Sequence, residues 1–276
     1  MFVEKLRRRW AERNTLLCVG LDPDLSRFPE AVRDRKDAIF AFNRAIIDAT
    51  ADLVCAFKPQ VAHYSAYGAE DQLEATIDYL RSEHPGIGIL LDAKRGDIGS
   101  TAEMYAREAF DRYRADAVTV NPFMGFDAVE PFLARADKGV VVLCRTSNPG
   151  ARTFQSLRVD GKPLYRRVAE EAVQRWNTHG NLLLLVGATY PRELRELREL
   201  AGDVPFLVPG VGTQGGSVVQ AVANGQDAQG TGLLISSSRA VLYASSGADF
   251  ELAARQKALS LRDEINRARQ ARLPDA

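Results

Sequence analysis

Short apolar segments rich in branched side chains recur along the chain, with an average spacing of about 31 residues, the size of one strand–helix unit. They begin at residues 15, 53, 88, 117, 139, 181, 205 and 232 and read TLLCVGLD, LVCAFKP, GILLDAK, AVTVNP, GVVVLCRT, NLLLLVGAT, PFLVPGVG and GLLISSS. Their apolar residues do not alternate cleanly with polar ones, a pattern typical of parallel strands that are covered on both faces. We therefore expect eight buried strands.

The segments between these runs have the apolar spacing of helices. After the third run, apolar and aromatic residues recur three or four positions apart at Ala102, Tyr105, Ala106, Ala109, Phe110 and Tyr113. Eight strand–helix units in a chain of this length favour a closed barrel over an open doubly wound sheet, and the first turn, LDPDLSRFPE, lacks the G-x-G-x-x-G pattern of dinucleotide-binding sheets. The fold prediction is α/β, a (β/α)8 TIM barrel, with residues 1–276 in a single domain.

Two segments lie outside this repeat. Residues 1–14 read as an amphipathic opening helix, an N-terminal extension of the barrel. Residues 147–165, SNPGARTFQSLRVDGKPLY, form an unusually long connection after the fifth run. Because a loop of that length in a compact domain is usually functional or disordered, and because it starts at the barrel face where active sites are built, we expect it to be an active-site lid.

Composition restricts the classes of partner. Of 276 residues, 46% are hydrophobic and 26% charged, which suits one domain with a large core. The 36 basic residues balance the 36 acidic ones, so no global field favours nucleic acid or an anionic membrane. No apolar stretch reaches the roughly 18 residues of a membrane-spanning helix, and the first residues lack the apolar core of a secretory signal. We expect a cytoplasmic protein that binds a small molecule.

Cysteine and histidine show no pattern of a metal site. Cys18, Cys55 and Cys144 are odd in number, widely spaced and embedded in apolar runs, which indicates small buried side chains and argues against a disulfide framework or bound zinc. The three histidines have no ligand spacing, and only His63, which follows a strand, is kept as an outside candidate for the site.

Charged side chains crowd at the ends of the first three apolar runs. The third run leads directly into DAKRGD, which holds Asp92, Lys94 and Asp97, while Lys58 ends the second run and Asp22 the first. In a regular strand Asp92 and Lys94 point to the same side, into the barrel mouth. A structural layer of ion pairs is the alternative, but charge at this face of a barrel is typical of catalytic groups. We interpret the five residues as one network of alternating charge.

The seventh and eighth units carry a pattern for binding phosphate. Gly210, Gly212, Gly215 and Gly216 surround Gln214 in VPGVGTQGGS, and Arg239 follows the eighth run. These two loops are the usual phosphate cradle of the barrel fold, where glycine amides and a helix N-terminus favour an anion and an arginine can bind two phosphate oxygens. Glycines that serve only a tight turn are the alternative.

In these motifs the sequence resembles the orotidine 5′-phosphate decarboxylase family, specifically the longer bacterial and archaeal-type branch that carries DAKRGDI. The resemblance covers nearly the whole chain, and no departure is visible at the matching motifs. These are GLDPD with Asp22, FKPQ with Lys58, LDAKRGDIGST with Asp92, Lys94 and Asp97, TSNPG with Ser147, PGVGTQGG with Gln214, and SSSRA with Arg239.

The resemblance implies a cofactor-free and metal-free reaction in which orotidine 5′-monophosphate loses carbon dioxide to give uridine 5′-monophosphate, the last step of pyrimidine nucleotide synthesis. Lys94 would deliver a proton to C6, with Asp92 and Asp97 beside it. Lys58 and Asp22 would engage the ribose.

Two further implications concern the loops and the assembly. In the family the second aspartate and the isoleucine and threonine near it come from the partner subunit, which here implies a homodimer with Asp97, Ile98 and Thr101 in shared sites. We expect Ser147 to contact the pyrimidine and Gln155 to bridge base and phosphate, with ordinary loop polarity as the alternative for Gln155.

Three other readings stay open at this stage. Another phosphate-binding barrel lyase, such as a sugar-phosphate decarboxylase or synthase, would use magnesium, but AFKPQ supplies a lysine where a second acid is expected. A Schiff-base aldolase would use Lys94, yet an ammonium between carboxylates is a poor nucleophile. A silent uridylate-binding barrel would bind nucleotide without turnover.

Overall fold

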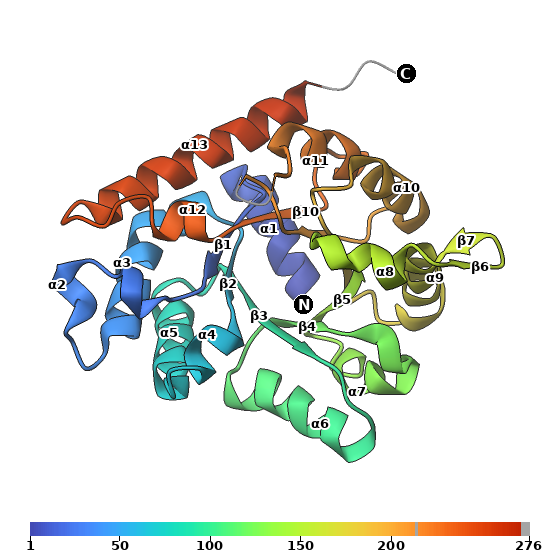
Figure 1. The fold of residues 1–276 in the computed structure, drawn as a ribbon, viewed down its shortest axis with the longest axis horizontal. Coiled ribbons are helices and arrows are strands. Elements are labelled where there is room, and N and C mark those ends of the chain that lie inside the picture. The colour runs from blue at the N-terminus through green and yellow to red at the C-terminus, as the bar shows by residue number, and fades with distance from the viewer. Residues whose placement is uncertain (213–214, 272–276) are drawn as a thin grey trace.

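A computed structural model describes residues 1–212 and 215–271, and within them eight parallel strands close into a barrel (Figure 1). Around the barrel the neighbouring strands are β1, β10, β9, β8, β5, β4, β3 and β2. Their bounds are β1 (Leu17–Leu21), β2 (Ala56–Pro59), β3 (Gly88–Arg95), β4 (Ala117–Val120), β5 (Gly139–Arg145), β8 (Leu182–Val186), β9 (Phe206–Val208) and β10 (Leu233–Ser237). Each of the eight apolar runs contains one of these strands, so the predicted (β/α)8 barrel is confirmed.

Helices follow the strands and cover the outside of the barrel (Figure 1). The longer ones are α3 (Ala38–Thr50), α5 (Glu70–Glu83), α6 (Gly99–Arg107), α9 (Leu164–Glu171), α10 (Pro191–Ala201), α11 (Val218–Gly225) and α13 (Phe250–Gln270). Short helices and turns lie at the loops: η1 (Leu25–Arg27), α2 (Glu30–Arg33), η2 (Ala51–Leu53), α4 (Val61–Ser65), η4 (Pro122–Met124), η5 (Phe126–Ala128), α7 (Glu130–Leu133) and α12 (Arg239–Leu242). Two π-helical turns, η3 (Glu108–Arg112) and η7 (Ala172–Trp176), extend α6 and α9.

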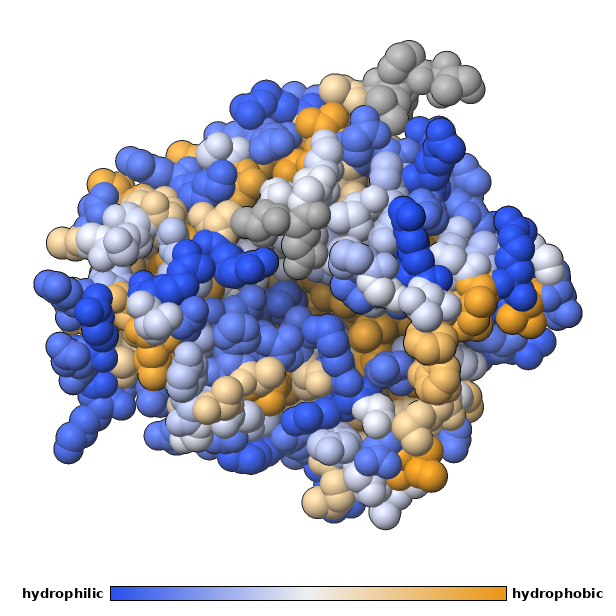
Figure 2. All heavy atoms as spheres, in the orientation of Figure 1, coloured by the Kyte–Doolittle hydropathy of each residue, from blue (hydrophilic) through white to orange (hydrophobic). Residues whose placement is uncertain are grey.

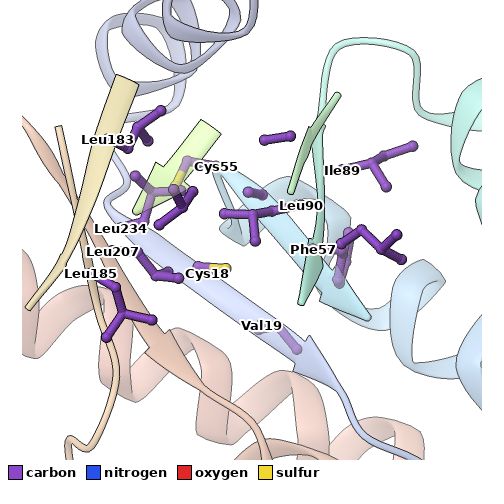
Figure 3. Close-up of a cluster of buried hydrophobic side chains, with 14 of the residues drawn as sticks. Cys18, Val19, Cys55, Phe57, Ile89, Leu90, Leu183, Leu185, Leu207 and Leu234 are labelled. Atoms are coloured by element: carbon purple, nitrogen blue, oxygen red, sulfur yellow. The ribbon is translucent and has the colours of Figure 1, made fainter. Parts of the chain in front are cut away.

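The core is continuous from the barrel interior to the packed faces of the helices. Strands β1, β8 and β10 are buried along their whole length, as expected of strands covered on both sides. Figure 3 shows such buried side chains from several strands, among them Cys18, Leu90 and Leu234. Cys18, Cys55 and Cys144 are all buried and free, which confirms their prediction as small core residues, and burial raises the pKa of the Cys55 and Cys144 thiols to about 12.

Helix α1 (Phe2–Arg13) lies at the end of the barrel where the strands begin, as the predicted opening helix. The Phe2 backbone N–H donates to Asp137 O at 3.1 Å, and its ring packs against Gly88 and Gly139, the first residues of β3 and β5. Lys5 adds an ion pair to Asp116 at 2.9 Å. The glycines are required here because a methyl group at Gly139 would overlap the Phe2 ring.

The long connection 147–165 has secondary structure of its own, where the sequence suggested only an extended loop. It contains η6 (Pro149–Ala151), α8 (Arg152–Gln155) and a hairpin of β6 (Arg158–Val159) and β7 (Lys162–Pro163). The two turn residues, Asp160 and Gly161, have φ of 50° and 78°. An Asp-Gly pair with both φ values positive is the preferred two-residue hairpin turn, so VDGK is the signal in the sequence.

No helix within residues 1–212 and 215–271 is long and apolar enough to cross a membrane.

Replacing Gly139 by alanine should lower the free energy of unfolding by about 1–3 kcal/mol, because the added carbon would overlap the Phe2 ring and lie 2.9 Å from Ala117 Cβ in a packed layer. Urea unfolding midpoints measure the effect. Gly86→Ala is the matched control, since a Cβ there meets no heavy atom within 4 Å. Equal midpoints for the two variants would contradict the close packing of α1 on the barrel.

Candidate active site

A cavity of about 790 Å³ opens at the carboxyl ends of the strands, a volume in the range of small-molecule sites. Figure 2 shows hydrophilic side chains around this central hollow. Eight of the residues selected from the sequence line it: Asp22, Lys58, Asp92, Lys94, Ser147, Gln155, Gly210 and Arg239. His63, the outside candidate, lines it as well, with Nδ1 2.9 Å from Pro23 O. Parallel strands bring their carboxyl ends to one face, which is why residues so far apart in the chain meet here.

Three charged side chains form a row at the bottom of the cavity. Lys58 Nζ donates to Asp92 Oδ2 at 3.0 Å, and Lys94 Nζ donates to Asp92 Oδ1 at 2.5 Å. Lys58 and Asp92 are only 5% and 6% exposed, while the Lys94 side chain is 43% exposed and reaches the open part of the cavity. The structure therefore brings together Lys58, Asp92 and Lys94 as the sequence predicted.

The charges in this row favour the charged forms of Asp92 and Lys58. Burial alone would raise the pKa of Asp92, but the positive charges of Lys58 and Lys94 outweigh it and hold that pKa well below its usual value. Burial would likewise lower the pKa of Lys58, and the negative charges of Asp92 and Asp22 reverse the shift and raise it. A buried carboxylate between two ammoniums is stable only as this complete set.

Asp22 lies beside this row, and one of its carboxylate oxygens accepts no hydrogen bond from the described residues. Its Oδ1 lies 4.0 Å from Lys58 Nζ, and it is buried without a hydrogen-bond partner among the residues that the structure describes. A buried carboxylate oxygen with no donor is costly to a folded protein and is suited to accept a hydrogen bond from a ligand hydroxyl. This oxygen marks a place in the cavity where a ligand donor would be favoured.

The end of β3 departs from the regular alternation expected from the sequence. Leu91 pairs with Val118 and Arg95 with Val120, so residues 92–94 lie opposite the single residue Thr119. Lys94 has a φ of 48°, in the left-handed region. Asp92 and Lys94 do meet, but through this local irregularity and not through the regular pleat.

Asp97, Ile98 and Thr101 do not line the cavity of the single chain. Asp97 accepts a hydrogen bond from the neighbouring Ile98 N–H at 2.8 Å, and Ile98 and Thr101 are exposed around the start of α6. Asp97 thus does not flank Lys94 within one chain. Whether a partner subunit supplies it is a separate matter.

The seventh and eighth loops match the expected phosphate cradle only in part. Arg239 lines the cavity from the start of α12 and is exposed. In the seventh loop, the N–H groups of Gly212, Gly215 and Gly216 donate within the loop at 2.8–3.0 Å, to Gly216 O, Gly212 O and Gly210 O. In this conformation these three amides are therefore bonded within the loop, and their binding of phosphate stays a prediction. Gln214 lies outside the described residues.

Gln155 connects the long connection to the end of β5. Its Oε1 accepts from Thr146 N at 2.9 Å and from Arg145 Nη1 at 3.3 Å, and its Nε2 donates to Thr146 Oγ1 at 2.9 Å. Ser147 is half-buried at the cavity wall.

Sequence reasoning missed two residues that support this region. Arg145 is 1% exposed, lies 3.8 Å from the centre of the Tyr190 ring and holds Gln155. Thr119 bonds to Asp92 and to the β3 backbone. The signal in the sequence was a polar residue within an apolar run: Arg145 in VVLCRT and Thr119 in AVTV. Only tertiary structure shows what they contact.

Acidification should destabilise the parent protein through Asp92. A carboxyl group whose pKa is lowered by folding contributes stability above its unfolded pKa of about 4, and that contribution is lost as the pH falls below this value. Asp92→Asn removes the titrating group, so its unfolding midpoint should fall less than the parent's between pH 6 and pH 3.5, as measured by circular dichroism. Asp34→Asn, at an exposed carboxyl, is the control and should behave as the parent. Parallel curves for all three proteins would refute the coupling.

Comparisons of sequence and of structure with known proteins identify the same family. The model of the orotidine 5′-phosphate decarboxylase / HUMPS family matches residues 15–250. The orotidine 5′-phosphate decarboxylase of Cellvibrio japonicus is 58% identical over 270 residues, covering 97% of this chain and 99% of that protein. The one from Janthinobacterium sp. is 59% identical over 266 residues, covering 96% and 98%.

Solved structures agree. The OMP decarboxylase of Leishmania donovani superimposes with a TM-score of 0.85 at 40% identity, over 98% of this chain and 99% of that one. The match of fold, length and sequence includes every strand that builds the cavity. The chain belongs to the orotidine 5′-phosphate decarboxylase / HUMPS family.

Proposed function

We propose that this protein decarboxylates orotidine 5′-monophosphate to uridine 5′-monophosphate and CO2 without a cofactor, the last step of de novo pyrimidine nucleotide synthesis. The observation that carries the proposal is the buried row of Lys58, Asp92 and Lys94 at the cavity floor, in a chain whose relatives bear the decarboxylase name. We place the reaction in the cytoplasm, where its free cysteines would remain reduced.

Lys94 is the proposed catalytic acid. When CO2 leaves C6 of the pyrimidine, the electron pair stays in the plane of the ring, where delocalisation gives little help. A fixed ammonium stabilises the developing charge more in the transition state than in the substrate, and it can then donate its proton to C6. The geometry supports this role because Lys94 is held by Asp92 at 2.5 Å while its side chain is still accessible from the cavity.

Asp92 orients that ammonium by accepting its hydrogen bond. With its pKa well below the usual value, Asp92 is an anion at neutral pH and would face the carboxylate of the substrate. Repulsion between the two anions disfavours the bound substrate and disappears as CO2 departs. Lys58 offsets part of the repulsion between Asp92 and the substrate carboxylate, because its ammonium binds the other Asp92 oxygen.

The rest of the substrate provides binding energy. Asp22, with its buried free oxygen, and Lys58 are proposed to bind ribose hydroxyls. Arg239, Gly212 and Gln214 are proposed to bind the phosphate, for which the seventh loop would have to rearrange its internal hydrogen bonds. Ser147 and Gln155 would contact the pyrimidine and the base–phosphate side, so that phosphate binding closes residues 147–165 over the site as a lid.

We also propose a homodimer with shared active sites. Large apolar side chains are exposed on α6 and the turns beside it: Phe123 is 82% exposed, Met104 60% and Ile98 51%. Figure 2 shows apolar side chains gathered toward the lower right of the visible face. An exposed apolar surface of this kind is typical of a protein interface. A partner seated there could bring its Asp97, Ile98 and Thr101 to the cavity of the first chain.

Turnover of orotidine 5′-monophosphate tests the proposed reaction directly. Mixing the protein with this nucleotide should cause loss of the substrate's ultraviolet absorbance, and Lys94→Ala should slow the reaction by several orders of magnitude because the developing charge loses its cation. Lys257→Ala, at an exposed lysine of α13, is the control and should retain the parent rate. No turnover by the parent would sink the proposal.

Mixing inactive variants tests whether sites are shared. Asp97→Ala mixed with Lys94→Ala should regain activity, because each hybrid dimer would contain one site with an intact Lys94 and an intact partner Asp97. Mixing Asp92→Ala with Lys94→Ala is the control and should regain none, since both residues belong to the same side of the site. Hybrid dimers that form, as judged by native mass spectrometry, but stay inactive in the first mixture would argue against shared sites.

A further inference from the structure

We propose that Thr119 is a positioning residue for the reaction: its buried hydroxyl fixes the irregular end of β3 and so sets where Lys94 and Asp92 lie. The inference deepens the proposed decarboxylase function and rests on it. It assigns no contact with substrate to Thr119, which acts through the two charged residues.

The first observation is the mismatch between β3 and β4. Three residues of β3, 92–94, lie opposite Thr119 alone, between the regular pairs Leu91–Val118 and Arg95–Val120. Extra residues in one strand leave backbone groups without partners in the ladder. Buried backbone N–H groups are rarely left without an acceptor, so something else must serve those of the bulged residues.

The Thr119 hydroxyl serves them. Its Oγ1 accepts from Ala93 N at 3.0 Å and from Lys94 N at 2.9 Å, and it donates to Asp92 Oδ1 at 3.0 Å. A hydroxyl has one hydrogen to donate and two lone pairs to accept with, so all its capacity is used. Thr119 is 0% exposed, so water does not compete for these bonds.

The second observation is the backbone conformation that these bonds hold. Lys94 has a φ of 48°, which is unfavourable for a non-glycine residue and persists only where the surroundings impose it. On the Thr119 side the Lys94 N–H is bonded, and on the other side Arg95 is fixed by two hydrogen bonds to Glu108 at 2.9–3.0 Å. The turn at Lys94 therefore has an anchor before it and another after it, and its side chain is directed to Asp92.

The third observation is that position 119 holds a threonine where a valine would fit the buried layer. Thr119 stands between Val118 and Val120 in β4, and β5 beside it carries buried valines at 140–142. A valine has nearly the same shape as threonine. A hydroxyl in a fully buried layer is unfavourable unless its hydrogen bonds are made. Here each of them leads to the backbone or the side chain of the residues beside the reacting position, which is the pattern of a support for the site.

Thr119→Val is the decisive variant because it removes the hydroxyl and keeps the shape. We expect kcat to fall about 100-fold with KM changed by no more than about threefold, since Lys94 and Asp92 would be misplaced while the proposed ribose and phosphate residues are untouched. Thr119→Ser restores the hydroxyl and should recover most of kcat. A kcat within about twofold of the parent in Thr119→Val, or no recovery in Thr119→Ser, would overturn the inference.

Thr15→Val is the matched control for loss of a buried hydroxyl. Thr15 is also 0% exposed, and its Oγ1 donates to Leu53 O at 2.6 Å and accepts from Leu17 N at 3.2 Å, at the start of β1 and so at the other end of the barrel. We expect it to lower the unfolding midpoint as Thr119→Val does, with kcat unchanged. An equal loss of kcat in both variants would assign the effect to general stability and refute the inference.

Backbone hydrogen exchange separates this inference from the proposed function. The amides of Ala93 and Lys94 should be protected in the parent and in Thr119→Ser, and should exchange at least about tenfold faster in Thr119→Val, because they lose their acceptor. This readout needs no substrate. If the parent does not turn over orotidine 5′-monophosphate, the reaction assignment fails; if these amides exchange equally in all three proteins, the role of Thr119 fails.

Discussion

A single buried carboxylate between two ammonium groups is the interaction on which the site depends. Asp92 is 6% exposed, and an isolated charge in that position would be strongly disfavoured. Lys58 and Lys94 each bind one of its oxygens, so the three are tolerated only together. Lys58 is buried and balances the charge of Asp92. Lys94 is accessible from the cavity, as its proposed role as catalytic acid requires.

The barrel separates stability from chemistry. At the end where the strands begin, α1 packs Phe2 against glycines, and Lys5 pairs with Asp116. At the opposite end the strands finish in polar and charged side chains around an open space. Supports such as Arg145 and Thr119 lie between these two regions, where an apolar layer meets the site. They are buried polar groups whose hydrogen bonds reach the loops and strand ends that carry the charged residues.

The proposed dimer follows from what one chain leaves unfinished. Its cavity contains the lysines and two of the three predicted aspartates, Asp22 and Asp92, while Asp97 lies outside beside exposed apolar residues. The exposed apolar residues beside Asp97 are the reason for proposing that two chains associate. The connection 147–165 also lies beside the cavity, because Gln155 is hydrogen-bonded to Thr146 directly after β5.

The sequence alone determined the number of strands, the barrel, and the meeting of Asp22, Lys58, Asp92, Lys94, Ser147 and Arg239 at one face. It could do so because burial on both sides leaves apolar runs, and because parallel strands bring their carboxyl ends together. The hairpin in 147–165 was also encoded, by Asp160 and Gly161, although its signal was not used.

Only the tertiary structure decided how those residues meet. The register shift between β3 and β4 and the left-handed Lys94 depend on contacts between segments distant in sequence. The hydrogen bonds within the seventh loop join residues 210–216 to one another, in a conformation that the glycine pattern alone does not specify. Local spacing carries no information about a hydroxyl 25 residues away that accepts from the Lys94 N–H. The position of Asp97 outside the cavity has the same origin, since a strand that ends in a bulge directs the next residues by its packing and not by its alternation.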